Sequence, residues 1–356
     1  MKVAVIGAGN GGQAIAGYLA LTGHEVSLYN RNEEVISELK SKGSITLKGC
    51  IEGESTPALF TSNIEEAIKD AELIMVTTTA VAHHELAHTM APFLKDDQII
   101  VLNPGRTGGA LEFRNVLTDE GCSKRLYIAE AQTLVYACRI VSPGTVNIIG
   151  IKDSVYLSAY PSGDTDNVLR CLGQLYPCFR AAENILRTSL GNVGAIFHPC
   201  VLLFNAATVE RKNEFYFYRD MTEQVGRFIE MFDAERIAVG KAYGVDLMPV
   251  SDWIVNAYPD TVGDTLCEKM RNNPAYYDIK SPSSIYTRQL MEDIPTGVLP
   301  ILELGKKAGL NMKLHESLVN IIGALLNVDF RENGRTLERL GLSGLSRDEI
   351  LATLVQ

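Results

Sequence analysis

The sequence lacks both an excess of positive charge and a pattern of paired cysteines. Its 33 lysine and arginine residues are outnumbered by 43 aspartate and glutamate residues, which gives a formal net charge of -10. Such a balance disfavours nonspecific binding to nucleic acid or to acidic membrane surfaces. The 7 cysteines are scattered and form no C-x-x-C pair, so neither a disulfide framework nor a zinc site is expected. We therefore expect a protein of the reducing cytoplasm that binds neither nucleic acid nor membrane.

Long apolar runs, low-complexity tracts and internal repeats are also missing. No uninterrupted apolar stretch approaches the length needed to cross a membrane. The first expected strand begins at Lys2, so we expect no cleaved secretory signal ahead of it. A chain of 356 residues suits two domains, because domains usually hold roughly 100 to 200 residues.

Glycine, in contrast, is concentrated where a nucleotide would bind. The apolar run KVAVI is followed by GAGNGG, then by a helical stretch of small residues, and then by a second apolar run that ends in LYNR. Gly7 permits a tight turn, Gly9 lets backbone amides approach a pyrophosphate, and Gly12 lets the helix pack closely on the strand. An ordinary glycine-rich turn without a ligand seldom keeps all three glycines in register. The sequence therefore predicts a dinucleotide-binding βαβ unit with cofactor contacts at Gly7, Ala8, Gly9, Asn10, Gly11 and Gly12.

The end of the second apolar run indicates which dinucleotide binds. An acidic residue there would bind the adenosine ribose hydroxyls of NAD, but this chain has Asn30 and Arg31. A guanidinium suits a 2′-phosphate, and no carboxylate follows before Glu33. We therefore expect NADP(H) to be favoured over NAD(H); the alternative is that Arg31 is merely a solvated loop cation.

The first half of the chain alternates strand and helix patterns, and the second half is almost entirely helical. Further strands are expected in SITLKG, AELIMVTTT, DQIIVLNPG and RLYIAEA, as in a parallel doubly wound sheet. TVNIIGI and SVYLSAYP follow with only Lys152 and Asp153 between them, which suggests a hairpin or an antiparallel extension. FRAAE suggests one last strand. Beyond Leu186, apolar residues recur at helical spacing. The expected architecture is an α/β Rossmann-type domain over residues 1–186, followed by a mostly α-helical domain over residues 187–356.

The helical half offers the residues of a proton-transfer site. His198 stands near the start of a long helical segment, and histidine titrates in the range that acid–base catalysis needs. Asp293 is the candidate carboxylate to fix the histidine tautomer, and Arg288 could hold a substrate carboxylate. Each residue has an ordinary alternative, namely a core histidine, a helix N-cap before Pro295, and a surface charge.

A series of motifs follows in order along nearly the whole chain: GAGNGG, LNPGRTGG, TLVYACR, GNVGAIFHP and the R-x-x-x-x-D of YTRQLMEDIP. Taken together, these motifs resemble the octopine/nopaline (opine) dehydrogenase family. The resemblance implies that His198 and Asp293 form a catalytic pair and that Arg288 holds the carboxylate of an oxo acid. It also implies a helical domain similar to the C-terminal domain of 6-phosphogluconate dehydrogenase. The sequence departs from the pattern at Asn30, where some relatives have an acidic residue, and at Val135, where proline is expected.

The reaction that the resemblance implies is a reductive condensation. The amine of an L-amino acid adds to the carbonyl of a 2-oxo acid such as pyruvate, water leaves, and NAD(P)H delivers hydride to the imine carbon. Asn103 follows a strand at the sheet edge where ligands gather, so its amide could serve the nicotinamide, although a turn-forming Asn-Pro is an equal alternative. Asn192, shortly before His198, is expected to line the substrate site.

One motif points to different chemistry. His84, Glu85 and His88 spell H-E-x-x-H, the zinc pattern of metalloproteases. A third ligand is not evident from the sequence, because the context of Glu112 cannot be judged. We therefore expect no metal.

The sequence leaves open two other functions and the possibility of a homodimer. Ketopantoate reductases and 3-hydroxyacid or glycerol-3-phosphate dehydrogenases also join a glycine-rich sheet domain to helices, but they usually rely on a lysine, and the segment from Asn192 to Arg211 holds none. A non-catalytic NADPH-sensing protein is the alternative outside the enzymes. The long apolar helices could pack within one subunit or across a homodimer.

Overall fold

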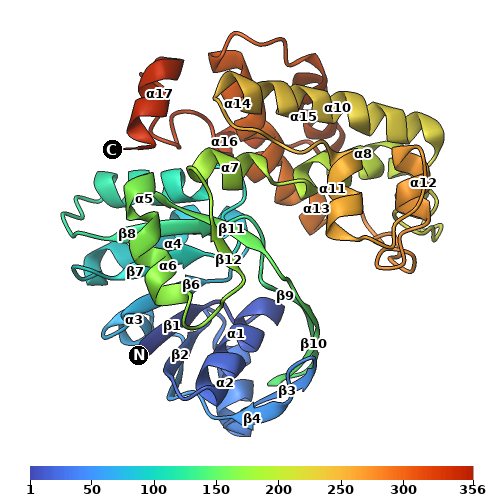
Figure 1. Ribbon diagram of the computed structural model, residues 1–356. Helices are drawn as coiled ribbons and strands as arrows, with labels where there is room; N and C mark the ends of the chain where they lie inside the picture. The colour runs from blue at the N-terminus through green and yellow to red at the C-terminus, as the bar shows by residue number, and fades with distance from the viewer. Residues whose placement is uncertain (356) are drawn as a thin grey trace. The chain divides into compact units, whose positions relative to one another are not determined.

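The computed structural model describes residues 1–355 and divides the chain into two compact units (Figure 1). The first unit holds Met1–Ser189 together with the residues from Ala352 onward, and the second holds Leu190–Leu351. The first boundary lies inside helix α7 (Ile185–Leu190), a little after the predicted position at Leu186. The second lies inside helix α17 (Arg347–Thr353), in a stretch that the prediction assigned wholly to the helical domain.

The first unit is built on an eight-stranded sheet with the order β12-β11-β8-β7-β6-β1-β2-β5. The six strands from β8 to β5 are parallel neighbours, whereas β11 runs antiparallel to β8. This is the predicted Rossmann-type sheet with an antiparallel extension. Its strands are β1 (Lys2–Ile6), β2 (Glu25–Tyr29), β5 (Leu59–Thr61), β6 (Leu73–Val76), β7 (Ile99–Leu102), β8 (Tyr127–Ala131), β11 (Val155–Tyr160) and β12 (Phe179–Ala181).

Helices flank this sheet and explain its apolar strands (Figure 1). Every residue of β6 is buried, as are three of the four residues of β7, because a parallel sheet is covered on both faces. The connecting helices are α1 (Asn10–Leu21), α2 (Glu33–Lys42), α3 (Ile64–Ile68), α4 (His83–Met90), α5 (Gly109–Asp119) and α6 (Thr165–Leu172), with short 3₁₀ turns η1 (Ala80–Ala82), η2 (Ala91–Phe93) and η3 (Ser162–Asp164).

A second, four-stranded sheet corrects two of the predictions. Its order is β4-β3-β10-β9, formed by β4 (Gly53–Ser55), β3 (Ile45–Gly49), β10 (Thr145–Ile151) and β9 (Tyr136–Ser142). SITLKG, which was expected in the parallel sheet, forms β3 of this small sheet. TVNIIGI forms β10, which pairs with β9 and makes no hairpin with β11. Alternating apolar residues specify a strand with one buried face, but they do not specify which sheet it joins.

Helix α1 packs against one face of the small sheet. Gly17 lies opposite β3, where a Cβ atom would come within 2.7 Å of the Ile45 side chain and 2.9 Å of the Leu47 side chain. The absence of a side chain at Gly17 therefore lets α1 approach the small sheet closely. Since α1 also packs on β1 and β2, the helix that follows the glycine turn is held on two sides.

The second unit is mostly helical, as predicted. Its longest helix, α10, begins at the N-cap Thr222, whose hydroxyl accepts a hydrogen bond from the Val225 amide. No helix within residues 1–355 is both long enough and apolar enough to span a membrane. The elements are α8 (Gly194–Phe204), α9 (Ala206–Glu210), α10 (Glu223–Ala242), α11 (Val250–Ala257), α12 (Leu266–Arg271), α13 (Arg288–Met291), the π-helical turn η4 (Ile294–Val298), α14 (Leu299–Lys307), α15 (Lys313–Leu326) and α16 (Phe330–Asn333).

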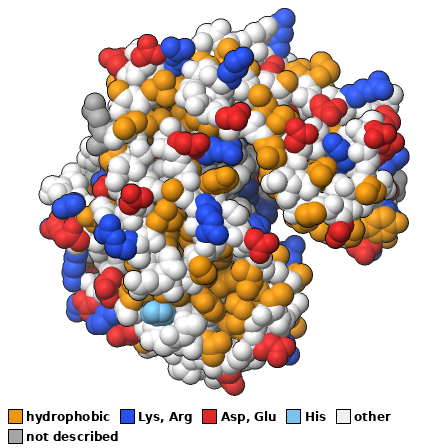
Figure 2. Space-filling model, in the orientation of Figure 1, with side chains coloured by type: hydrophobic (Ala, Val, Ile, Leu, Met, Phe, Trp, Pro, Cys, Tyr) orange, Lys and Arg blue, Asp and Glu red, His pale blue; other side chains and the backbone are white. Residues whose placement is uncertain are grey.

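The surface seen in Figure 2 carries charges of both signs, with lysine and arginine lying among aspartate and glutamate. Hydrophobic side chains gather over part of the first unit on the same face. Exposed apolar residues of the small sheet include Val141, Ile149 and Ile151. No large area of one charge sign on this face marks a binding site.

Candidate functional site

The glycine turn after β1 has the geometry of a nucleotide cradle. Gly7 has a φ of 107°, a conformation that residues with side chains rarely adopt. A Cβ on Gly12 would lie 1.6 Å from the Gly7 carbonyl oxygen, so only glycine fits there. A Cβ on Gly9, the N-cap of α1, would meet no atom within 4 Å. The turn therefore leaves open space in front of the free amides of a helix N-terminus, which suits a pyrophosphate.

Two polar side chains of α1 hold the glycine turn against its surroundings. The Asn10 side-chain oxygen accepts a hydrogen bond from the Ile140 amide in β9 at 2.8 Å. The Gln13 side chain donates to the Ala8 carbonyl at 2.9 Å and accepts from the Gly144 amide at 3.1 Å. The side chain of Asn10, a predicted cofactor contact, is thus already engaged in fixing α1 to the small sheet.

Asn30 and Arg31 lie between β2 and α2. The Asn30 side-chain oxygen accepts a hydrogen bond from the Asn32 amide at 2.9 Å, and Asn32 in turn caps α2. Arg31 is exposed. Burial raises the pKa of the neighbouring Tyr29, and the positive charge of Arg31 opposes that rise. A guanidinium therefore stands at the carboxyl end of β2, where the adenosine ribose of a dinucleotide binds in this fold.

Asn103 occupies the end of β7 and turns inward. Its side-chain amide donates to the Val101 carbonyl at 3.0 Å, and the residue is 2% exposed. The peptide bond to Pro104 is cis. The burial of Asn103 and its hydrogen bond to Val101 support a structural role in the turn, which the sequence offers as an alternative to a cofactor contact.

In the second unit, the structure brings His198 and Asp293 together. The His198 Nδ1 atom lies 2.6 Å from the Asp293 Oδ2 atom, although 95 residues separate them in sequence. The Asp293 side chain is 2% exposed and the His198 side chain is 21% exposed. Asp293 precedes η4 but makes no capping hydrogen bond there, so its carboxylate serves the histidine instead of the helix end.

The approach of α8 to η4 explains this pairing. A Cβ on Gly297 would lie 2.5 Å from the Cβ of Ala195 and 3.1 Å from the side-chain nitrogen of Asn192. Glycine at this position therefore allows the two elements to touch. Asn192, 4% exposed, lies at the same contact.

The pairing fixes the tautomer of the histidine. A carboxylate oxygen accepts, so Nδ1 carries the proton and Nε2 is the ring nitrogen that bears a lone pair. The Phe217 ring packs against the imidazole at a centroid distance of 6.0 Å. Burial raises the pKa of the nearby Tyr218, and the negative charge of Asp293 raises it further, so this phenol stays neutral.

Arg288 lies on α13, one helical turn before Asp293. Its Nη1 atom donates to the Glu292 Oε2 atom at 2.6 Å, and its side chain is 59% exposed whereas that of Glu292 is 4% exposed. The buried carboxylate therefore anchors one face of the guanidinium. The remaining donors of Arg288 can face a ligand, since a guanidinium has five N–H groups.

The H-E-x-x-H residues lie on α4 and make contacts of another kind. His88 Nδ1 is 2.7 Å from Glu120 Oε1, and His84 Nδ1 is 3.8 Å from Glu112 Oε1. Among residues 1–355, no group of three histidine, cysteine or acidic side chains is placed to hold a metal ion. The two histidines thus pair with different carboxylates.

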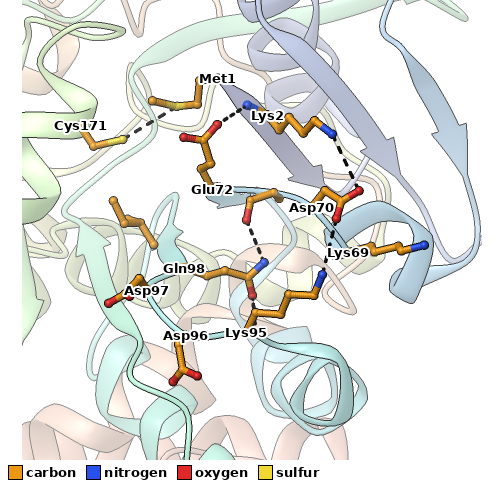
Figure 3. A pocket seen from close by; sticks show the side chains of 12 residues that line it. Met1, Lys2, Lys69, Asp70, Glu72, Lys95, Asp96, Asp97, Gln98 and Cys171 are labelled. Carbon is orange, nitrogen blue, oxygen red and sulfur yellow. Dashed lines mark hydrogen bonds and ion pairs between the residues drawn. The ribbon is translucent and has the colours of Figure 1, made fainter.

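A hollow of about 660 Å³ lies near the amino ends of β1, β6 and β7, at the edge of the large sheet opposite to the glycine turn (Figure 3). Two of its lysines are engaged with an acidic residue: Lys2 lies 3.8 Å and Lys95 lies 3.5 Å from Asp70. The Gln98 side chain donates to the backbone carbonyls of Ile68 and Ala71. These contacts indicate a structural role, and ligands of doubly wound sheets bind at the other edge.

Two charged residues near the carboxyl ends of the strands of the large sheet could not be singled out from the sequence. Glu130 at the end of β8 is fully buried and accepts hydrogen bonds from Thr188, Ser189 and the Ala110 amide. Lys152, regarded only as a separator between two strands, donates to the Thr133 hydroxyl and to the Leu134 carbonyl. The signal in the sequence that could have drawn attention to Lys152 is the position of a charged residue between two apolar strands.

The helical unit matches a known family. Residues 181–326 fit the model of the alpha-helical domain of NAD/NADP octopine/nopaline dehydrogenases. Residues 2–107 fit the N-terminal domain of NAD-dependent glycerol-3-phosphate dehydrogenases. An opine dehydrogenase of Arthrobacter sp. (strain 1C) is 39% identical over 345 residues, which cover 96% of each chain. This chain is a member of the opine dehydrogenase family.

Solved structures agree with the family assignment at the level of the fold. Octopine dehydrogenase with NADH and L-arginine superposes with a TM-score of 0.85 at 24% identity, over 99% of this chain and 98% of the other. The same enzyme with NADH and pyruvate gives a TM-score of 0.82 at 23% identity, with the same coverage. As a member of the opine dehydrogenase family, the protein is an NAD(P)-dependent oxidoreductase with a Rossmann-type domain.

Proposed function

We propose that this opine dehydrogenase family member condenses the α-amine of an L-amino acid with a 2-oxo acid such as pyruvate and reduces the resulting imine. The observation that carries the proposal is the 2.6 Å hydrogen bond between His198 and the buried Asp293. Structures of octopine dehydrogenase with L-arginine and with pyruvate support the two substrate classes. The family assignment favours this reaction over those of ketopantoate reductases and hydroxyacid dehydrogenases, and over a non-catalytic sensor.

The proposed roles follow from the chemistry of each group. The amine must lose a proton before it attacks a carbonyl, and the departing hydroxyl must gain one; His198 exchanges both at Nε2. Asp293 holds the ring in one tautomer and stabilises the imidazolium form. Arg288, anchored by Glu292, neutralises and orients the carboxylate of the oxo acid, and Asn192 lines the same site. When bound, the nicotinamide supplies the hydride.

We further propose that NADP(H) is preferred over NAD(H). The glycine turn of residues 7–12 accepts the pyrophosphate of either dinucleotide. The 2′-phosphate distinguishes them, and the exposed guanidinium of Arg31 at the end of β2 offers it a bidentate partner.

The test is NADPH oxidation with pyruvate, first alone and then with a panel of L-amino acids. Turnover that requires both acids is expected. The variant His198→Ala should lower kcat by roughly 10²- to 10⁴-fold, the usual contribution of acid–base catalysis, while NADPH affinity stays unchanged.

The matched control is His88→Ala, which removes an exposed histidine that also bonds a carboxylate, at 2.7 Å. That variant should keep its activity. Oxidation by the oxo acid alone would indicate a hydroxyacid dehydrogenase, and no oxidation across the panel would favour a sensor. Full activity in His198→Ala would exclude the proposed pair.

A further inference from the structure

Tyr218 is a buried tyrosine, and no group among residues 1–355 forms a hydrogen bond with its hydroxyl. The hydroxyls of Tyr258 and Tyr276, in contrast, bond each other at 3.1 Å. Only 6% of Tyr218 is exposed, and its oxygen is not one of the fully enclosed polar atoms that lack a partner, so the exposed part includes the oxygen. A buried phenol usually finds a partner. For Tyr218 that partner has to come from solvent or from a ligand.

Aromatic rings fix the position of this phenol. Tyr218 belongs to the loop between α9 and α10, and its ring stacks on that of Tyr276 at a centroid distance of 4.7 Å and an interplanar angle of 22°. The rings of Phe217 and Phe197 meet it edge-on, at 4.9 Å and 6.2 Å. Such packing restrains the side chain, so the hydroxyl keeps one direction before any ligand binds.

The loop that carries Tyr218 is itself tied to the segment after α12. The Phe217 amide donates to the Ile279 carbonyl at 2.7 Å, and the Ser281 amide donates to the Phe215 carbonyl at 2.8 Å. The Arg219 guanidinium lies over the ring of Tyr277, at 4.6 Å from its centroid. Backbone and side-chain contacts thus hold this loop on both sides of Tyr218, as a preorganised binding group requires.

The phenol lies beside the pair of His198 and Asp293. The Phe217 ring packs on the His198 imidazole at 6.0 Å and on the Tyr218 ring at 4.9 Å, so one side chain contacts both. Phe197, the residue before His198 on α8, also contacts the Tyr218 ring. Asp293 is close enough for its negative charge to act on the phenol. All five residues belong to the second unit.

A neutral phenol acts as a hydrogen-bond donor and not as a base. Burial and the charge of Asp293 raise the pKa of Tyr218, so the phenol keeps its proton. In the proposed reaction His198 takes the proton of the amine and Arg288 holds a carboxylate, which leaves the carbonyl oxygen of the oxo acid without a donor during the attack. As the C–N bond forms, the π electron pair of the carbonyl moves onto this oxygen. A fixed donor at the oxygen therefore stabilises the transition state.

We propose that the Tyr218 hydroxyl donates a hydrogen bond to the carbonyl oxygen of the 2-oxo acid and stabilises the charge that this oxygen gains. The proposal rests on the proposed function, to which it adds a catalytic residue. Tyr218 keeps its own proton throughout, and the proton that the departing hydroxyl needs comes from His198. The competing partner for the Tyr218 hydroxyl is an ordinary water molecule, in which case its removal has no effect on the reaction.

The first test is Tyr218→Phe, which keeps the ring and removes only the hydroxyl. Because that hydroxyl bonds no group among residues 1–355, Tm should not fall. The kcat for the condensation should fall by about 10- to 100-fold, the effect of losing a hydrogen bond to a charged group. The control is Tyr258→Phe, which removes a neighbouring hydroxyl that is already bonded to Tyr276 and should leave kcat almost unchanged.

Oxamate gives a second readout that does not depend on turnover. It is an unreactive analogue of pyruvate that keeps the carboxylate and a carbonyl oxygen. Its dissociation constant is measured by calorimetry on the NADPH-loaded full chain. Tyr218→Phe should weaken oxamate by about 2- to 10-fold, the effect of losing a hydrogen bond between neutral groups, and should leave the affinity for NADPH and the KM of the amino acid unchanged.

Each outcome decides the proposal. Wild-type protein that does not bind oxamate, or Tyr218→Phe with unchanged kcat or unchanged oxamate affinity, would overturn it. So would a fall in the Tm of Tyr218→Phe or an equal loss of kcat in Tyr258→Phe, because the hydroxyls would then serve the fold. A loss confined to the KM of the amino acid would assign the contact to the amine instead of the oxo acid. If no amino acid supports turnover but Tyr218→Phe still weakens oxamate, the proposed condensation fails and the contact with the oxo acid stands.

Discussion

At the scale of single residues, we expect one side chain, Arg31, to determine which dinucleotide is preferred. Arg31 is exposed at the end of β2, where a 2′-phosphate would lie. Replacing Arg31 with alanine should lower kcat/KM for NADPH by about 10- to 100-fold, because one charge-assisted contact is lost, and should leave kcat/KM for NADH almost unchanged. Steady-state kinetics with both cofactors measure the ratio. Lys40→Ala, on the exposed last turn of α2, is the control. An unaltered ratio in Arg31→Ala would mean that the guanidinium is only a solvated charge.

The residue types of the site could be predicted from the sequence, but their contacts could not. The spacing of Gly7, Gly9 and Gly12 is local, and local geometry follows from it directly. The contact of His198 with Asp293 depends on how two distant segments pack. The sequence offered Asp293 as a candidate partner, and the resemblance to a family implied the pair. Lys152 escaped notice because the groups that it contacts, Thr133 and Leu134, lie in the segment after β8, and no short motif records such a contact.

At the scale of elements, the contact between α8 and η4 positions the hydrogen-bonded pair of His198 and Asp293. Gly297→Ala would place a methyl group 2.5 Å from the Ala195 Cβ and force the two elements apart. We expect the free energy of unfolding to fall by about 1–3 kcal/mol, as for other overpacked cores. We also expect kcat to fall with little change in NADPH affinity, because the histidine loses its carboxylate.

Chemical denaturation and single-turnover kinetics test this expectation. Gly344→Ala, where an added Cβ would meet no atom within 4 Å, is the matched control in the same unit. If Gly297→Ala and Gly344→Ala behave alike, the close approach of α8 to η4 has no part in catalysis.

Elements were predicted well where both faces of a strand are buried and poorly where one face is open. The apolar runs of β6 and β7 belong unmistakably to a covered parallel sheet. The alternating pattern of β3 fits either sheet. β3 joins the small sheet, where Gly17 allows α1 to pack closely against this strand. β9 was not predicted as a strand, since its first four residues, YACR, were considered only as part of the motif TLVYACR.

At the scale of the whole molecule, stability should depend on a buried histidine. His315 is fully buried, stacks on Phe232 at a centroid distance of 3.9 Å, and bonds Glu235 at 2.8 Å. Burial lowers the pKa of His315 below 6.5, despite the opposing effect of Glu235. Burial also acts to raise the pKa of Glu235, but hydrogen bonds from His315 and two backbone amides lower it overall.

The sign of the pH effect follows from proton uptake. Between the lowered pKa and 6.5, unfolded chains bind a proton at this histidine that folded chains exclude. Tm should therefore fall as the pH drops through about 6.5, and the Glu235 contribution should be lost at still lower pH. In His315→Gln the fall near pH 6.5 should be shallower, as measured by thermal melts from pH 8 to pH 5. Parallel curves for the two proteins would contradict the assignment.

The first unit is discontinuous along the chain, and this has a consequence for fragments. The Leu354 side chain is 1% exposed, and the Leu354 carbonyl accepts a hydrogen bond from the amide of Ser162, the first residue of η3. A fragment that stops after Ser189 would leave the Ser162 amide without its acceptor. It would also expose to water the apolar surface that Leu354 covers. Dissecting the enzyme into separately expressed halves therefore calls for a circular permutant or a grafted C-terminal segment, and not for a single cut.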